Sequence, residues 1–181
     1  VKPVKTKAVE SFVCCARSLK NYGAQTELFK TISVLLARDK SYWNRITYFD
    51  FCFSVIKHFS RQFFKDFFFA EVMNLAKDPV PNVRRRFCFL LPHIKLVLEL
   101  PNDVQMLADL KERISFLTLD KDRDVAEAAR YAHDELTTID NEIMRGYKLN
   151  LLSRADLFDK QKQREEEEWI SSGGDKAGAT M

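Results

Sequence analysis

Glycine and proline are scarce in this chain of 181 residues, which contains five of each. A turn-rich β-sandwich, a nucleotide-binding fold with a glycine-rich loop and a low-complexity chain all need more of these residues. Sequence signatures of catalysis are missing too, because no phosphate loop, GxGxxG, HExxH or GxSxG motif occurs. The sequence therefore predicts a protein that is not an enzyme and that needs no cofactor.

Long apolar runs are also missing, since no stretch reaches the ~18 uncharged residues of a membrane span. The opening VKPVKTKAVE lacks the apolar segment of a signal peptide, and Val1 in place of Met suggests a piece of a longer protein. The four cysteines lie among apolar residues without a CxxC motif, which predicts free, buried thiols and no metal site. These features favour a cytoplasmic protein, and they are also compatible with the nucleus.

Phenylalanine and charge are unevenly distributed. Eleven of the fifteen phenylalanines lie between Phe49 and Phe89. Residues 1–98 carry 17 basic and 7 acidic side chains (+10), whereas residues 99–181 carry 12 basic and 19 acidic ones (−7). Such polarity steers protein partners. Nucleic-acid binding is disfavoured, because the aromatic residues fall on apolar stripes and the basic residues scatter over all helix faces.

Almost every segment shows the apolar spacing of an amphipathic helix. Six successive stripes repeat with a period near 3.6 residues. They begin at Leu28, Ile46, Phe64, Val83, Val104 and Val125. The stretch 48–53 alternates like a strand, but its flanks continue the helical period. We therefore expect an all-α protein.

Polar turns separate these helices at a regular interval. Three turns align in one frame with periods of 39 and 42 residues: LLARDKSYWNRI (35–46), NLAKDPVPNVRR (74–85) and FLTLDKDRDVAE (116–127). The coinciding residues include Asp39, Asp78 and Asp120, then Val83 and Val125, and then Arg45 and Arg84. A repeat near 40 residues indicates an α-solenoid, because one helix pair cannot bury its apolar stripe alone.

The frame divides the chain into an array (1–145), a partly helical extension (146–170) and a tail (171–181) that is flexible by composition. Within the array we expect a truncated repeat and three helix pairs, at 4–20, 25–59, 61–99 and 103–145. Gly23 is expected to end the first helix in the left-handed conformation. The segment KQKQREEEEW (160–169) is polar on all sides, which predicts a solvated helix with local ion pairs.

The unit of apolar helix, Asp-Pro-x-x-x-Val-Arg turn and second apolar helix resembles the HEAT repeat. Residues 78–84 match this pattern fully, whereas Asn44 stands where Val is usual and Ala126 stands where Arg is usual. The resemblance covers about residues 4–145 and implies a right-handed superhelix. In HEAT repeats the aspartate and the arginine tie successive turns together. The resemblance therefore implies structural roles for the turn residues Asp39, Arg45, Asp78, Val83, Arg84, Asp120 and Val125.

The turns are similar to those of the scaffold and regulatory subunits of phosphatase 2A-like enzymes, and among them to the HEAT-repeat regulatory subunits of protein phosphatase 4. The chain lacks the His and Asp motifs of a phosphatase catalytic subunit. The resemblance therefore implies a non-catalytic module that binds a serine/threonine phosphatase catalytic subunit and directs it to other partners. Importins and tubulin-binding arrays also carry HEAT repeats, so a transport or cytoskeletal adaptor stays an alternative.

A partner is expected to dock along the turns. These turns are edge positions that the apolar stripes do not need, and rigid turns lose little entropy on binding. Trp43 is the strongest single candidate, because an aromatic residue near a turn is unusual. The expected partner-binding residues are Lys40, Trp43, Pro79, Asn82, Arg85, Arg86, Lys121 and Arg123.

Overall fold

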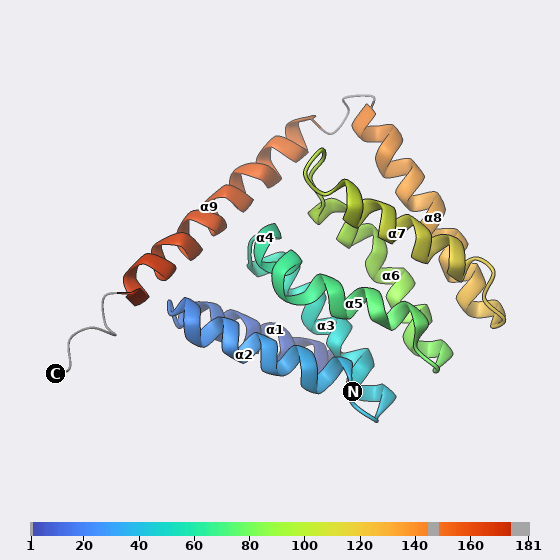
Figure 1. The fold of residues 1–181 in the computed structure, drawn as a ribbon, viewed down its shortest axis with the longest axis horizontal. Coiled ribbons are helices and arrows are strands. Elements are labelled where there is room, and N and C mark those ends of the chain that lie inside the picture. Colours follow the sequence, from blue (N-terminus) through green and yellow to red (C-terminus); the bar gives the residue numbers. More distant parts are fainter. Residues whose placement is uncertain (1, 145–148, 175–181) are drawn as a thin grey trace.

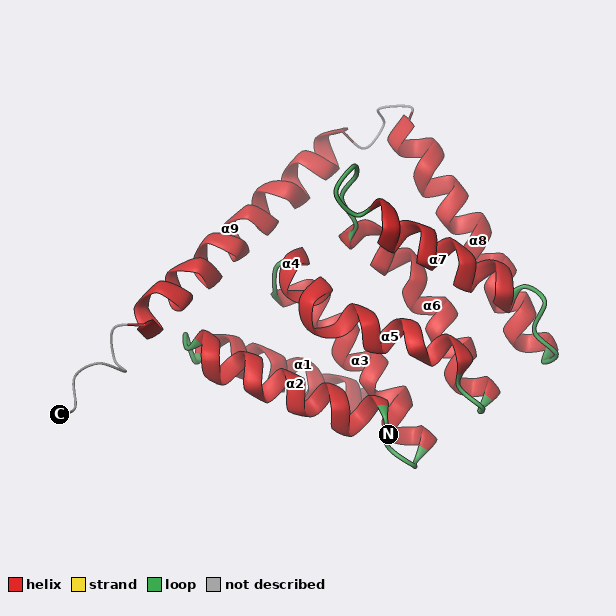
Figure 2. Ribbon diagram, viewed as in Figure 1, coloured by secondary structure: helices red, strands yellow, loops and turns green. Residues whose placement is uncertain are grey.

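The computed structural model describes residues 2–144 and 149–174, which form helices and short turns with no strand among them (Figure 2). The helices are α1 (Lys2–Ser18), α2 (Tyr22–Ala37), α3 (Tyr42–His58), α4 (Arg61–Phe64), η1 (Lys65–Phe69), α5 (Ala70–Asn74), η2 (Leu75–Lys77), α6 (Pro81–Val97), α7 (Val104–Leu117), α8 (Arg123–Met144) and α9 (Leu149–Gly174). In this part of the chain, no helix combines the length and the apolar character that crossing a membrane requires.

The helices before α9 form two layers (Figure 1). One layer holds the first helix of each pair, namely α2, the run from α4 to η2, and α7. The other layer holds α1, α3, α6 and α8, in which α6 packs between α3 and α8. Each layer covers the apolar stripes of the other. The prediction of an all-α solenoid is thereby confirmed, while the right-handed superhelix stays a prediction.

The phenylalanine-rich segment runs through a π-helical turn. η1 interrupts the α-helical run at Lys65–Phe69, and a π turn accommodates one extra residue. The neighbours Phe68 and Phe69 are consequently both buried, as are Phe63 and Phe64. Lys65 is buried in the same turn, and its Nζ lies 2.9 Å from Oδ2 of Asp103. The aromatic residues of this segment therefore fill the core and present no exposed patch.

The turn between α1 and α2 differs from the prediction. Lys20, with φ of 48°, adopts the left-handed conformation that was expected of Gly23. Gly23 lies inside the first turn of α2, because Asn21 caps this helix and its side-chain oxygen accepts a hydrogen bond from Ala24 N at 3.0 Å. An N-cap asparagine stabilises the start of a helix by about 1 kcal/mol, and α2 accordingly begins before Gly23.

The prediction of buried thiols holds for two of the four cysteines. Cys52 and Cys88 are buried in the core, and burial raises the pKa of the Cys88 thiol to about 12. Cys14 is partly buried, with its Sγ 3.5 Å from Nε2 of His58. The prediction is wrong for Cys15, which is exposed because it lies on the outward face of α1, the first helix of the array.

The C-terminal helix α9 runs back along one edge of the array, past the ends of α1 and α3 (Figure 1). It continues to Gly174, so the first residues of the predicted flexible tail are helical. The remaining tail residues 175–181, and the segment 145–148 between α8 and α9, lie outside the described residues. The turns inside each helix pair lie on the opposite edge, which α9 leaves open (Figure 1).

Candidate functional site

The three aligned turns share one local structure. The side chain of each repeat aspartate accepts a hydrogen bond from the backbone N–H two residues later: Ser41 N to Asp39 at 2.6 Å, Val80 N to Asp78 at 2.8 Å, and Asp122 N to Asp120 at 2.9 Å. Aspartate favours such turns because its carboxylate satisfies a backbone donor locally. The repeat in the sequence thus becomes a repeat of identical turns.

Two arginines tie these turns into a ladder. Arg45 donates from Nε and Nη2 to the carboxylate of Asp78 at 2.6 and 3.0 Å, and Arg84 donates in the same way to Asp120 at 2.7 and 2.8 Å. Each guanidinium also donates from Nη1 to a backbone carbonyl of its own turn, that of Asp39 for Arg45 and that of Asp78 for Arg84. A bidentate pair of this kind fixes orientation as well as distance.

The side chains of the ladder are buried, and their ion pairs shift the pKa values of Arg84 and Asp120. The side chains of Arg84 and Asp120 are only 7% and 5% exposed. The hydrogen bonds from Arg84 lower the pKa of the Asp120 carboxyl, and Asp120 in turn raises the pKa of Arg84. The next helix carries Ala126 where an arginine would continue the series, so the ladder ends at the third turn.

A groove between α3 and α6 brings together four of the eight predicted partner-binding residues. This α3–α6 groove has a volume of about 500 Å³ and is lined by Lys5, Tyr42, Trp43, Ile46, Asp50, Asn82, Arg85, Arg86 and Phe89. Trp43 belongs to the first turn of α3, is 60% exposed and contacts the ring of Tyr42 at a centroid distance of 4.7 Å. An exposed apolar floor of this kind is typical of a binding surface.

The three arginines at the start of α6 have three different environments. Arg84 belongs to the buried ladder. Arg86, one of the predicted partner-binding residues, pairs with Asp50 at 2.7 Å, and its guanidinium lies over the ring of Phe53, which holds it against α3. Arg85 is exposed, lies 5.6 Å from the centroid of Phe89, and makes no ion pair among the described residues. Arg85 is thus the arginine of the three that is available to a partner.

The other four predicted residues lie elsewhere on the turns. Pro79 and Lys121 line a second hollow, of about 660 Å³, together with the exposed Phe116 and Leu119 of the neighbouring turn. Lys40 and Arg123 are exposed and line neither hollow. The predicted set therefore divides between a groove on the layer of second helices and the edge formed by the turns.

The contacts of α9 were not found from the sequence. Glu166, in the segment expected to be solvated, is buried and accepts hydrogen bonds from the backbone N–H of Ser60 at 2.9 Å and from Arg17 at 3.1 Å. Asp159 accepts a hydrogen bond from the backbone N–H of Arg61 at 2.8 Å. These carboxylates satisfy donors at the start of α4 that no helical carbonyl reaches. The residues that they contact lie between 98 and 149 positions away, so no local pattern indicated them.

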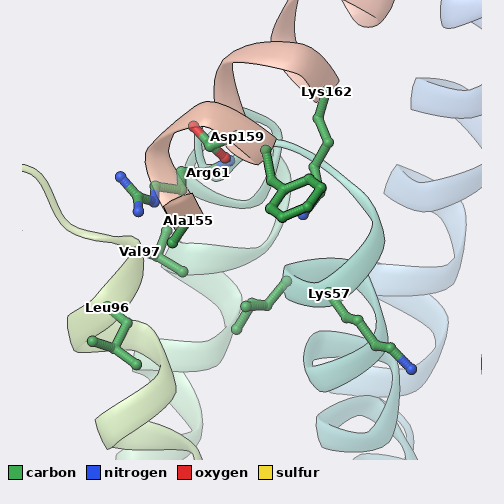
Figure 3. A pocket seen from close by; sticks show the side chains of 9 residues that line it. Lys57, Arg61, Leu96, Val97, Ala155, Asp159 and Lys162 are labelled. Carbon is green, nitrogen blue, oxygen red and sulfur yellow. The ribbon is translucent and has the colours of Figure 1, made fainter. Parts of the chain in front are cut away.

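The side of α9 nearest α3 and α6 borders a hollow of about 450 Å³ (Figure 3). Lys57, Arg61 and Lys162 stand around it, together with the apolar residues Leu96 and Val97. Its cations already have partners: Arg61 pairs with Glu99 and Asp156, and Lys162 donates to the carbonyl of Phe59. We therefore regard this hollow as part of the packing of α9. Among the described residues, no cluster of His, Cys, Asp or Glu could hold a metal ion.

Two curated proteins align with 126 residues of the chain, or 69% of its length. Both are called serine/threonine-protein phosphatase 4 regulatory subunit 4, and they are 36% (Mus musculus) and 35% (Homo sapiens) identical to it. The chain is thus similar to regulatory subunit 4 of protein phosphatase 4. The similarity confirms the resemblance to regulatory subunits of protein phosphatase 4 that the turns indicated. Both relatives are regulatory subunit 4 in particular. The chain spans 14% of the length of these relatives.

No family model matches the chain. No solved structure matches it either. The similarity to regulatory subunit 4 therefore rests on sequence identity.

Proposed function

We propose that the chain is a non-catalytic scaffold that binds a serine/threonine phosphatase catalytic subunit through its turn edge, defined as residues 40–43, 79–82 and 121–123. The ladder is the observation that carries this proposal. Its two buried ion pairs, Arg45 with Asp78 and Arg84 with Asp120, hold three turns in a fixed row. A preorganised row loses little entropy when it binds a folded partner.

The exposed side chains of the turn edge support the proposal. Trp43 is largely exposed at one end, and beside the other end Leu119 is 87% exposed, between Phe116 and Lys121. Large exposed apolar side chains that lie together often mark a protein interface. Because α9 covers the opposite edge, the turn edge is the side of the array that remains accessible (Figure 1).

The relatives support a regulatory role within a phosphatase complex, since both are called regulatory subunits of protein phosphatase 4. Such a role needs no catalytic group of its own, and catalysis would reside in the partner. We also propose the cytoplasmic location that the free thiols favour.

Capture on beads tests the docking proposal. The purified 181-residue chain should retain the purified catalytic subunit of protein phosphatase 4. Lys121→Glu combined with Leu119→Ser should reduce the retained amount at least tenfold, because it removes the exposed apolar contact and reverses a charge at the turn edge. The matched control is Lys111→Glu, which alters an exposed lysine in the middle of α7.

The control variant should retain the catalytic subunit as the wild type does, and circular dichroism should show the same helicity for all three proteins. A folded wild-type chain that captures no catalytic subunit would contradict the proposal. Equal capture by the turn-edge variant and the wild type would contradict it as well.

A further inference from the structure

The α3–α6 groove has a counterpart one repeat further along. This second hollow, the α6–α8 groove, has a volume of about 290 Å³, shares Arg85 and Phe89 with the first, and is completed by Asp124, Glu127, Ala128 and Tyr131 of α8. In the repeat frame these α8 residues occupy the positions of Asn82, Arg85, Arg86 and Phe89. Equivalent positions of three successive helices therefore line one continuous surface.

The charges on this surface are separated by sign. At the α3–α6 groove it carries Lys5 of α1 and Arg85 of α6, which are exposed and make no ion pair among the described residues. Over α8 it carries Asp124 and Glu127, which are exposed and likewise form no ion pair in that part of the chain. A ligand that complements both ends must be acidic at one end and basic at the other.

Aromatic side chains provide the apolar contacts along the same surface. Each of the three helices contributes one: Trp43 of α3, Phe89 of α6 and Tyr131 of α8, which are 60%, 41% and 65% exposed. Exposed tryptophan and tyrosine residues commonly dominate the binding energy of an interface. An apolar side chain of a ligand would find its deepest contact between Trp43 and Phe89, since both line the larger groove.

We propose that these two grooves bind one extended segment of a partner protein with a fixed order of side chains. Across the helices, an apolar residue lies between Trp43 and Phe89, an acidic residue follows beside Arg85, and a basic residue lies beyond it at Asp124 and Glu127. Packed helices lie ~8–10 Å apart and an extended chain advances ~3.3 Å per residue, so the acidic and basic residues are about three positions apart. A nucleic acid does not fit, because the α8 half is negative.

This proposal is independent of the phosphatase-docking proposal, because its ligand and its readout involve no catalytic subunit. The probe is the fluorescently labelled peptide GLFEESKKG, measured by fluorescence anisotropy against the purified 181-residue chain. The reversed sequence GKKSEEFLG is tested in parallel, because the surface fixes the order of the side chains along the groove and either chain direction can supply it. At least one of the two should bind, and replacing its Glu or its Lys residues by Gln should weaken it several-fold.

Charge reversal on the protein provides the second test. Arg85→Glu should weaken the binding peptide about tenfold, because repulsion replaces attraction, and a peptide with Lys in place of Glu should regain affinity for this variant. The matched control is Arg130→Glu, an exposed arginine of α8 that lines neither groove. Glu127→Lys should weaken the Lys-containing peptide but not its Gln counterpart, whereas Glu135→Lys, also exposed on α8, should change neither.

Three outcomes would overturn the proposal. The first is that neither peptide binds to the folded chain. The second is that Arg85→Glu and Arg130→Glu weaken binding equally, which would indicate attraction to overall charge. The third is that peptides of any charge order bind alike, which would indicate an unselective apolar contact.

Discussion

Arg84 joins neighbouring turns with a guanidinium group, whose hydrogen-bond donors lie in a fixed plane. Lysine cannot reproduce this geometry. Its side chain and that of Asp120 are almost completely buried. Replacing Arg84 by Met would keep most of the packing but leave the Asp120 carboxylate buried without its partner. We expect the free energy of unfolding to fall by roughly 3–5 kcal/mol, as measured by urea denaturation.

An exposed ion pair gives the matched control. Arg38 is 63% exposed and pairs with Glu71 on the surface. Arg38→Met should lower the free energy of unfolding by less than about 1 kcal/mol, because solvent screens the pair. Similar losses for Arg84→Met and Arg38→Met would show that the ladder is no more stabilising than a surface contact.

The ladder also predicts how stability depends on pH. Arg84 lowers the pKa of Asp120 below the value of about 3.9 that an unfolded aspartate has. A carboxylate whose pKa is lowered by folding contributes stability above its unfolded pKa, and this contribution is lost as the pH falls through the folded-state pKa. The free energy of unfolding should therefore decline below about pH 4, and less steeply in Arg84→Met than in the wild type. Equal slopes for the two proteins would contradict this.

At the scale of the helix, the sequence predicts well wherever an apolar stripe exists. The helices from α1 to α8 follow the 3.6-residue period, because burial of that stripe determines where a helix packs. The π turn at Lys65–Phe69 was not predicted, since it depends on filling the core with Phe68 and Phe69 together. The same limit applies to Gly23, whose conformation was decided by the capping residue Asn21.

The packing of α9 could not be predicted from an apolar stripe. Its segment 160–169 has no apolar stripe, so helical periodicity gives no information about where it packs. It is held by charged and polar contacts instead, with Glu166 against Ser60 and Arg17. Contacts between single polar groups that are distant in sequence leave no periodic pattern, which is why the expectation of a solvated helix was wrong at Glu166.

Glu166 should therefore decide whether α9 stays docked. Glu166→Ala leaves the backbone N–H of Ser60 without its acceptor and removes one partner of Arg17. We expect amide hydrogen exchange to accelerate in residues 154–172, while α3 and α6 keep their protection. Glu167→Ala, which changes an exposed neighbour, should leave the exchange unchanged. Unaltered exchange of α9 in Glu166→Ala would contradict the role assigned to this residue.

At the scale of the molecule, the two halves of opposite charge neutralise each other in part. Ion pairs join them at several points: Lys65 with Asp103, Arg84 with Asp120, Lys95 with Asp140, and Arg17 with Glu165 and Glu166. The sequence showed the charge asymmetry but not this pairing. On the surface over α3, α6 and α8, the charges that face a partner are Arg85 and Lys5 on one side and Asp124 and Glu127 on the other.

The candidate surfaces were predictable to the extent that they follow the repeat. The alignment of turns identified the ladder residues and placed Trp43, Asn82 and Arg85 near one another. It did not show that these residues face a groove while Pro79 and Lys121 face a different hollow, because that depends on the direction of each side chain around its helix. The ion pair of Arg86 was not visible in the sequence for the same reason, since Asp50 lies on the adjacent helix.

Hydrogen exchange in the presence of the catalytic subunit of protein phosphatase 4 tests the central claim most directly. If the array is a scaffold that docks through its turn edge, amides in residues 38–43, 77–82 and 117–123 should exchange more slowly in the complex, while α9 and the middle of α6 remain unchanged. Slower exchange confined to α9 or to the part of the α3–α6 groove outside the turn edge (residues 46–50 and 85–89), or no slowing at saturating catalytic subunit, would contradict the account.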